Sequence, residues 1–398
     1  MTPRPRLLPL QLGVGWLMKY LSERRRRYFA RKSRWGLLPR RSTTGADKVR
    51  SLALAKAVSK RDFDAAVELL PAVPKRRVGE ERLIITTPPS HLSLSENYEE
   101  TLAFLMELRR SRAGPKGGLN RNVMRQWRSH IEMADIKQIG PAAGLVLAAE
   151  LDSFRHRVGR MTSLDQTWHE NVRSFFADSG LFELLDVKPQ SVSSKPAVGP
   201  LTKVLKYRRG STPDGQQADL LRSELEALCG EKFGPRIEVN NALCEAMTNA
   251  HHHAYPPDQV WWHAPPPGYW WSTGAWMPET GTMHMILYDQ GVGIPKTLPR
   301  SSHWASALPI LNRLDPERTD AGVIEAALEL RRTSTHISGR GRGLYEMAEW
   351  IDQTQSGFLR ILSGKGLVTY RPGRRVQRSN LRVPFQGTLI EWEINRGA

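Results

Sequence analysis

The alternation of hydrophobic and polar positions predicts a first folded region between residues 63 and 190. Residues 83–87 (LIITT) form an apolar, β-branched run that predicts a strand, and two prolines end it. A second strand is predicted over 131–139, where Gly-Pro follows. Helices are predicted from Ser95 onward, over 142–154 and over 167–176. This order of elements indicates a small α/β domain.

A second folded region is predicted after residue 200, with helices first and strands later. The predicted helices span 214–230, 239–254 and 343–354, and the predicted strands span 283–288, 358–363, 366–371 and 386–394. A tryptophan-rich hairpin is expected over 260–277 with its turn at 265–268, and at least half of its five tryptophans should pack inward. This pattern favours the α+β class, as an α/β sandwich with helices on one face of a mixed sheet.

Segment 187–200 (VKPQSVSSKPAVGP) separates the two regions, because it is rich in Pro, Ser and Val and has few residues that build a core. The predicted organisation is a basic N-terminal arm over 1–62, a small α/β domain over 63–190, a linker over 191–200 and a larger domain over 201–398.

The net charge of +18 is concentrated at the N-terminus. Residues 1–60 hold 16 basic and two acidic side chains, whereas the remaining 338 residues hold 42 and 38. A uniformly basic, histone-like protein is therefore excluded. The four arginines at 24–27 lie close to Tyr28, Phe29 and Trp35, a mixture of charge and stacking groups that suits nucleic acid. A solvated basic tail is the alternative for residues 1–60.

Composition favours a soluble, cytoplasmic protein. Hydrophobic residues make up 40% of the chain, and the mean hydropathy is −0.46. The apolar stretch 7–21 is about fifteen residues long, which is short for a membrane span, so no transmembrane segment is predicted. Contact with a membrane surface is the alternative for that stretch. The two cysteines, Cys229 and Cys244, exclude a disulfide scaffold and suit a reducing compartment.

Three motifs in the second region carry candidate chemistry. In the first, Glu245, Asn249 and His253 recur every four residues, which places them on one face of a helix. An Asn carbonyl oxygen suits Mg²⁺, and a Glu carboxylate can accept a proton from water. The alternative is an ordinary solvated helix face. The consecutive histidines 251–253 point in different directions on a helix, so one shared metal ion is not expected.

The second motif follows a predicted strand and reads Asp289-Gln-Gly-Val-Gly293. Gly291 and Gly293 would let the backbone approach a ligand closely. A carboxylate at the end of a strand can accept a hydrogen bond from an exocyclic amine, which would favour adenine over guanine. The alternative is a simple turn between two elements.

The third motif, residues 338–344 (SGRGRGL), opens a predicted helix. Its alternating glycines expose backbone N–H groups, and the helix that follows offers its positive end, so together they suit phosphate. Arg340 and Arg342 add cationic donors. A flexible loop is the alternative. The sequence GxxxxGK[ST] does not occur, which excludes a Walker-type phosphate loop.

In this order and spacing, the three motifs resemble those of the GHKL ATPase superfamily, which includes DNA gyrase, the heat-shock chaperone and sensor histidine kinases. The resemblance covers about residues 201–398 and ends with Gly387-Thr388 in the last predicted strand. It implies a Bergerat fold that binds ATP with Mg²⁺. Residues 295–338, between the second and third motifs, would then form a lid over the ATP.

The resemblance also implies a role for each matching residue. Glu245 would be the general base in a member that hydrolyses ATP, Asn249 the Mg²⁺ ligand, and Asp289 the carboxylate that reads adenine. The other implied nucleotide-binding residues are Gly291 and Gly293 at the adenine, Thr388 beside Asp289, and Gly339, Arg340, Gly341, Arg342, Gly343 and Leu344 at the phosphates.

Residues 245–255 are most similar to the helix of bacterial anti-sigma-factor kinases. The expected function is therefore Mg²⁺-dependent ATP binding and hydrolysis in a bacterial regulatory protein. One alternative is a Ser/Thr protein kinase acting on a separate STAS-type or sigma-type regulator. Another is a switch that binds ATP without hydrolysing it and changes its affinity for a partner.

The first region resembles a STAS domain, the partner fold of those kinases, in its strand followed by Ile139-Gly-Pro-Ala-Ala143 and a helix. STAS antagonists carry a phosphorylated serine at this turn, whereas residues 140–143 have no hydroxyl, so phosphorylation at that turn is not expected. A packing module or a homodimerisation module is the alternative for this region.

Overall fold

The computed structural model describes residues 45–78, 83–112, 130–131, 133, 135–158, 168–189, 202–232, 235–261, 266–330, 343–354 and 356–395. Several predicted features lie outside the described residues, namely the apolar stretch 7–21, the basic residues 24–34, the linker 191–200 and the glycine loop 339–342. Tertiary contacts divide the chain into Met1–Ala57 and Val58–Ala398. The sheets described below belong to the second unit.

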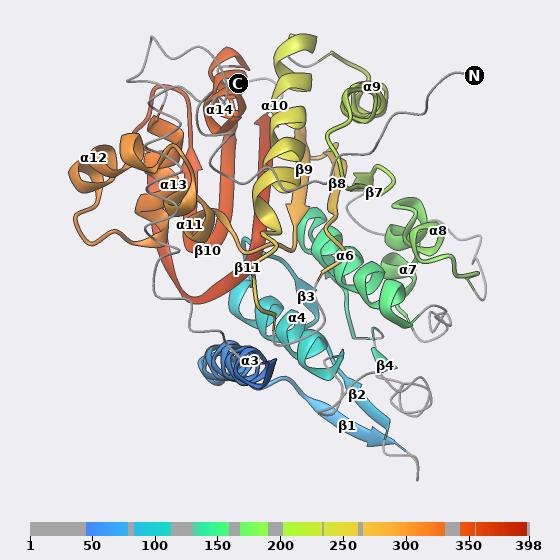
Figure 1. The fold of residues 1–398 in the computed structure, drawn as a ribbon. Coiled ribbons are helices and arrows are strands. Elements are labelled where there is room, and N and C mark those ends of the chain that lie inside the picture. Colours follow the sequence, from blue (N-terminus) through green and yellow to red (C-terminus); the bar gives the residue numbers. More distant parts are fainter. Residues whose placement is uncertain are drawn as a thin grey trace, which may run out of the picture. The chain divides into compact units, whose positions relative to one another are not determined.

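The strands of the main sheet are β6 (Lys203–Val204), β7 (Arg208–Gly210), β8 (Trp270–Met277), β9 (Thr282–Asp289), β10 (Phe358–Tyr370) and β11 (Gln377–Asn395). Their order is β10-β11-β9-β8-β6, and β7 also pairs with β8 (Figure 1). Every pairing among these strands is antiparallel, so the expectation of a mixed sheet is wrong for them. Short connections join β8 to β9 and β10 to β11, and such hairpins produce antiparallel neighbours. With its helices, the chain belongs to the α+β class.

Two turns differ from the prediction. The tryptophan-rich strand β8 turns back at 278–281, where Gly281 has a φ of 62°, and not at 265–268. Trp270, Trp271 and Trp276 are buried, as expected for at least half of the five tryptophans. The predicted break after residue 363 is absent from β10, because Gly364 has a φ of 59° and forms a bulge that lets the strand continue.

Helices α9 (Gly215–Cys229), α10 (Arg236–Asn249) and α14 (Gly343–Thr354) cover one face of the sheet, with α10 beside α14 (Figure 1). Helix α9 begins after Asp214, whose Oδ1 accepts hydrogen bonds from the amides of Gln216 and Gln217 at 2.9 and 3.1 Å. Helix α10 continues into one π-helical segment, η3 (Ala250–Ala254). Predicted helices 214–230, 239–254 and 343–354 are thus confirmed.

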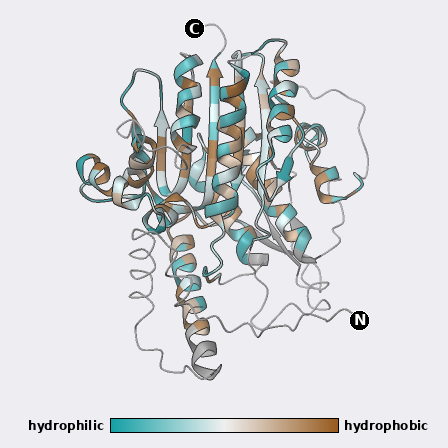
Figure 2. Ribbon diagram, turned by 45° about the horizontal axis from the view of Figure 1, so that its top comes forward, coloured by the Kyte–Doolittle hydropathy of each residue, from teal (hydrophilic) through white to brown (hydrophobic). Residues whose placement is uncertain are grey.

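The described helices that lie wholly within the first region are α4 (Tyr98–Arg112), α6 (Pro141–Val158), α7 (Glu170–Asp178) and α8 (Leu181–Leu185). Helix α6 packs on β8 and β9, and one core joins Leu102 and Leu145 to Trp271 and Leu389 of the sheet. All eight positions of β9 are buried, as expected for a strand covered on both faces, and Figure 2 shows hydrophobic stretches along the strands. The predicted arrangement, with helices on only one face of the sheet, therefore holds only for the part of the chain after residue 201. In the whole second unit, helices of the first region cover the other face.

The remaining strands are short. β2 (Leu83–Thr86) lies between β1 (Lys75–Val78) and β4 (His130–Ile131), and β3 (His91–Leu92) pairs in parallel with β5 (Gln138–Ile139). The single strand predicted over 131–139 is wrong, because β4 and β5 have different partners, and Met133 and Ile136 between them are buried in the core.

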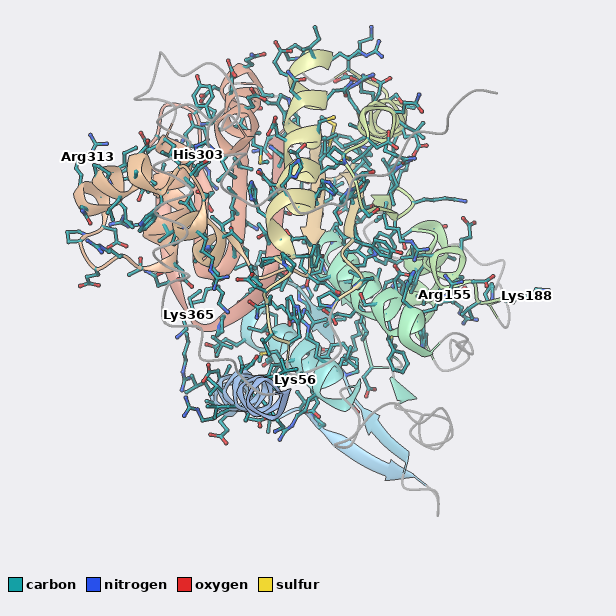
Figure 3. All side chains as sticks on the ribbon, viewed as in Figure 1. Lys56, Arg155, Lys188, His303, Arg313 and Lys365 are labelled. Atoms are coloured by element: carbon teal, nitrogen blue, oxygen red, sulfur yellow. The ribbon has the colours of Figure 1, made fainter. Side chains whose placement is uncertain are left out.

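Helix α3 (Gly45–Glu68) spans the predicted boundary at residue 62. At the other end of the first region, Arg155 (labelled in Figure 3) ties α6 to the end of α8. It donates to the Leu184 carbonyl and the Asp186 carboxylate at 3.0 and 3.2 Å. None of the helices in the described ranges has the length and apolar character that crossing a bilayer requires.

Candidate functional site

Asp289 is the last residue of β9, and only 5% of its surface is exposed. Its Oδ1 accepts a hydrogen bond from the Gly291 amide at 2.8 Å. Thr388 pairs with Asp289 in the sheet, and hydrogen bonding by Thr388 stabilises the ionised carboxylate. Burial raises the pKa of Asp289 to about 7, although these hydrogen bonds oppose the rise. Any further hydrogen-bond donor that a ligand supplies would therefore stabilise the ionised form of this carboxylate.

The glycines around Asp289 allow the backbone to pack more closely than a side chain would permit. A Cβ at position 291 would overlap the Ala254 carbonyl, and the amide of Val292 donates to that carbonyl at 2.9 Å. A Cβ at position 293, where φ is 85°, would lie 2.7 Å from Ser363 Oγ. Gly387, next to Thr388, likewise leaves no room for a Cβ beside the Asp289 carbonyl. The structure therefore brings together Asp289, Gly291, Gly293 and Thr388, as the resemblance of the motifs implies.

Ser363 on β10 belongs to this cluster, although no motif identifies it. Its buried hydroxyl lies 3.1 Å from Thr388 Oγ1 and accepts from the Ile294 amide at 2.9 Å. It also donates to the Gly387 carbonyl at 3.1 Å. Ser363 thus supports both Thr388 and the end of the Asp289–Gly293 loop. A single serine in an apolar strand carries no signal of this role in the sequence.

Helix α10 carries Glu245 and Asn249 as half-buried residues, while Leu243, Ala246 and Met247 face the core. The π-helical segment η3 then leads to Ala254, whose carbonyl contacts the Asp289–Gly293 loop through Val292. The helix type changes after Asn249, and His253 in η3 is exposed, whereas Glu245 and Asn249 are half-buried.

The residues predicted to bind phosphate, Gly339, Arg340, Gly341 and Arg342, lie outside the described residues. Gly343 begins α14, and the partly buried Leu344 packs against the same core as α10. Since α14 lies beside α10, the described end of the third motif is on the same sheet face as Glu245 and Asn249.

Residues 294–330 fold as α11 (Ile294–Thr297), η4 (Leu298–Arg300), α12 (Trp304–Leu314) and α13 (Asp320–Glu329). In α13, Ala321, Ile324 and Leu328 enter the core shared by α10 and α14. The backbone amide of Lys365 (labelled in Figure 3) donates to Asp320 Oδ2 at 2.7 Å. The prediction of a lid over 295–338 is therefore wrong for residues 320–329, and residues 331–338 lie outside the described residues.

Tyr255 and Gln290 hold the other side of the Asp289–Gly293 loop. The Gln290 amide donates to the Tyr255 hydroxyl at 2.9 Å, and that hydroxyl donates to the Tyr269 carbonyl. Burial and the nearby Asp289 carboxylate raise the pKa of Tyr255 well above its usual value, so it stays neutral. Tyr255 and Gln290 both belong to the sequence motifs, but the spacing of the motifs does not predict that these two residues are in contact.

The described part of the site therefore offers a hydrogen-bond acceptor at Asp289, and oxygen atoms that could bind a cation at Asn249 and Glu245. Among the residues that the structure describes, no group of three or more His, Cys, Asp or Glu side chains is placed to hold a metal ion. A cation beside Asn249 would take most of its ligands from water or from a bound molecule. No protein-family model matches this chain, and no curated protein is significantly similar to it.

Proposed function

We propose that residues 201–398 form a Bergerat-type domain that binds ATP with Mg²⁺ and hydrolyses it, as part of a regulatory protein. The observation that carries the proposal is the buried Asp289 carboxylate at the end of β9, in register with Thr388 and enclosed by glycines. The resemblance of the three motifs to the GHKL superfamily supplies the identity of the ligand.

Asp289 supports adenine over guanine for a chemical reason. Adenine presents an amino group at its sixth position, where guanine presents a carbonyl oxygen. The Asp289 carboxylate already accepts hydrogen bonds from Gly291 and Thr388, and it can accept another from the adenine amine. A guanine oxygen at the same place would repel the ionised carboxylate.

The remaining roles concern the phosphates. Asn249 would offer its carbonyl oxygen to Mg²⁺, and the bound ion would neutralise charge on the phosphate oxygens. Glu245, one helical turn earlier, would accept a proton from the attacking water. The residues proposed to hold the phosphates are Gly339, Arg340, Gly341, Arg342, Gly343 and Leu344.

Calorimetric titration with ATP, with and without Mg²⁺, followed by phosphate release, tests this proposal. Wild type should prefer ATP to GTP, and Asp289→Asn should lose at least about tenfold in ATP affinity, because a donor replaces one acceptor oxygen. Asn249→Ala should lose Mg²⁺-dependent binding, whereas Glu245→Ala should bind ATP and release little phosphate.

Matched controls lie on the same helix. Asn241→Ala and Glu238→Ala remove the same side chains from positions seven or eight residues earlier on α10, and both variants should bind and hydrolyse ATP like wild type. Equal ATP affinity of Asp289→Asn and wild type would contradict the proposal. Labelled phosphate transferred to a STAS-type protein would favour a kinase, and binding without turnover would favour a switch.

A further inference from the structure

A buried polar network joins the first region of the chain to the residue that follows Asp289. Glu150 and Ser153 lie three residues apart on α6, which packs on β8 and β9. Ser153 Oγ donates to Gln290 Oε1 at 2.6 Å, and Gln290 Nε2 donates to Glu150 Oε1 at 3.0 Å. All three residues are buried, so neither hydrogen bond can be exchanged easily for one to water.

The backbone of Gln290 is fixed as well. Its amide donates to the Tyr255 hydroxyl at 2.9 Å, and its carbonyl accepts from Gln386 Nε2 at 3.2 Å. The next amide, that of Gly291, is the donor that holds Asp289 Oδ1. The orientation of the peptide between Gln290 and Gly291 therefore determines where that donor points, and the Gln290 side chain is one of its restraints.

A buried ion pair orients Glu150 in turn. Arg109 on α4 donates to Glu150 Oε1 through Nε at 2.7 Å and also through a terminal nitrogen, which lies 3.1 Å from the Tyr288 hydroxyl. Attraction by Glu150 and by Tyr288 raises the pKa of Arg109 against the effect of its burial. A buried ion pair seldom stabilises a fold more than apolar side chains of similar size, because both charges lose water. Its defined geometry instead fixes the acceptor to which Gln290 donates.

We propose that Gln290 is a positioning residue, through which helix α6 of the first region holds the Asp289 carboxylate in the orientation that accepts adenine. The inference rests on the nucleotide function proposed above. The side-chain amide of Gln290 makes the two buried hydrogen bonds to Ser153 and Glu150. Without that side chain, the peptide between Gln290 and Gly291 loses both restraints, and the affinity for ATP falls about tenfold. Because coupling between two parts of a protein is reciprocal, bound ATP also strengthens the contact of α6 with the sheet.

The test uses the full chain with Gln290→Met, Ser153→Ala and Glu150→Gln. Gln290→Met and Ser153→Ala raise the Kd for ATP about tenfold, and KM rises while kcat stays constant, because Gln290 acts on binding alone. Glu150→Gln keeps an acceptor oxygen and loses less affinity. The double variant Gln290→Met/Ser153→Ala binds no worse than Gln290→Met, since both changes break the same contact.

Asp152→Asn is the matched control. Asp152 also lies on α6 and joins it to the sheet region, through Arg209 at 2.6 Å and Trp271 Nε1 at 3.0 Å, but it has no contact with Gln290 among its described hydrogen bonds. This variant lowers Tm and leaves the Kd for ATP unchanged. The proposal is overturned if Gln290→Met binds ATP as tightly as wild type, or if Asp152→Asn weakens binding as much as Gln290→Met.

Hydrogen exchange of the nucleotide-free protein separates this inference from the proposed function. The Gly291 amide should exchange faster in Gln290→Met and at the wild-type rate in Asp152→Asn. If wild type binds no ATP while exchange changes in this selective way, the coupling stands and the nucleotide function fails. If wild type binds ATP and Gln290→Met changes neither exchange nor affinity, the function stands and the coupling fails.

Discussion

Asp289 loses nearly all its contact with water on folding, and its carboxylate gains hydrogen bonds from Gly291 and Thr388 in exchange. Burial is the larger effect, so its pKa rises to about 7. The free protein therefore holds a carboxylate that is partly protonated near neutral pH. A ligand amine would favour the ionised form, and this residue would link nucleotide binding to proton release.

The raised pKa of Asp289 predicts a dependence of stability on pH. The folded state binds the proton more tightly than the unfolded state, so the free energy of unfolding decreases as pH rises from about 4 to about 7. Asp289→Asn cannot ionise, so relative to wild type its stability should increase over this window, by up to roughly 4 kcal/mol. Urea unfolding at pH 5 and pH 8 measures the difference.

The exposed Asp258 provides the control for this measurement, because Asp258→Asn should shift stability by less than about 0.5 kcal/mol at either pH. A stability difference between Asp289→Asn and wild type that does not grow with pH would contradict the assignment of a protonated, buried carboxylate.

At the scale of elements, the decisive contact is between the end of a helix and a strand-to-loop transition. Helix α10 continues as η3, and the Ala254 carbonyl at its end accepts from the Val292 amide. Gly291 lies directly against that carbonyl. The position of Asn249 relative to Asp289 thus depends on a close approach that only glycine allows.

Gly291→Ala should separate these two elements, because its Cβ would overlap the Ala254 carbonyl. We expect a loss of about 1–3 kcal/mol in unfolding free energy and weaker ATP binding. Gly215→Ala at the start of α9 is the control, since its Cβ would meet only Cys244 Sγ at 4.0 Å. That variant should be neutral or more stable by up to about 1 kcal/mol. Chemical unfolding and ATP titration of both variants check the prediction.

At the scale of the whole molecule, the sheet is shared by two regions that the sequence separates with a linker-like segment. Helices α9, α10 and α14 bury one face, and α6 with its neighbours buries the other. The second face carries large apolar residues, including Trp271, Ile286, Tyr288 and Leu389, which would be exposed without the first region.

A fragment of residues 201–398 should therefore be unstable by itself. Exposed apolar surface of this kind promotes association, so the fragment should bind an apolar dye and elute as aggregates in gel filtration. The full chain cleaved within 190–200 should remain one complex, because the cut leaves the shared core intact. A monomeric fragment that unfolds with the Tm of the full chain would contradict this prediction.

Much of the local structure followed from hydrophobic periodicity. The helices over 214–230 and 343–354 and the strand over 283–288 have the predicted type, with ends shifted by at most one residue. The predicted elements were wrong where the burial of side chains, or the conformation of one glycine, outweighed the local pattern of hydrophobic residues. Gly364 forms a bulge in place of a turn, and residues 131–139 split into two strands because Met133 and Ile136 are required in the core.

The order of the motifs can be read directly from the sequence, and the resemblance of these motifs to the GHKL superfamily, not their spacing, implies that Asp289, Gly291, Gly293 and Thr388 belong to one group. The contact of Ser363 with Thr388 and the contacts of Glu150 and Ser153 with Gln290 arise from the packing of separate elements. These partners lie 25 to 140 positions apart in the chain. Sequence periodicity describes neighbours within one element, whereas contacts across a sheet depend on how the separate elements pack.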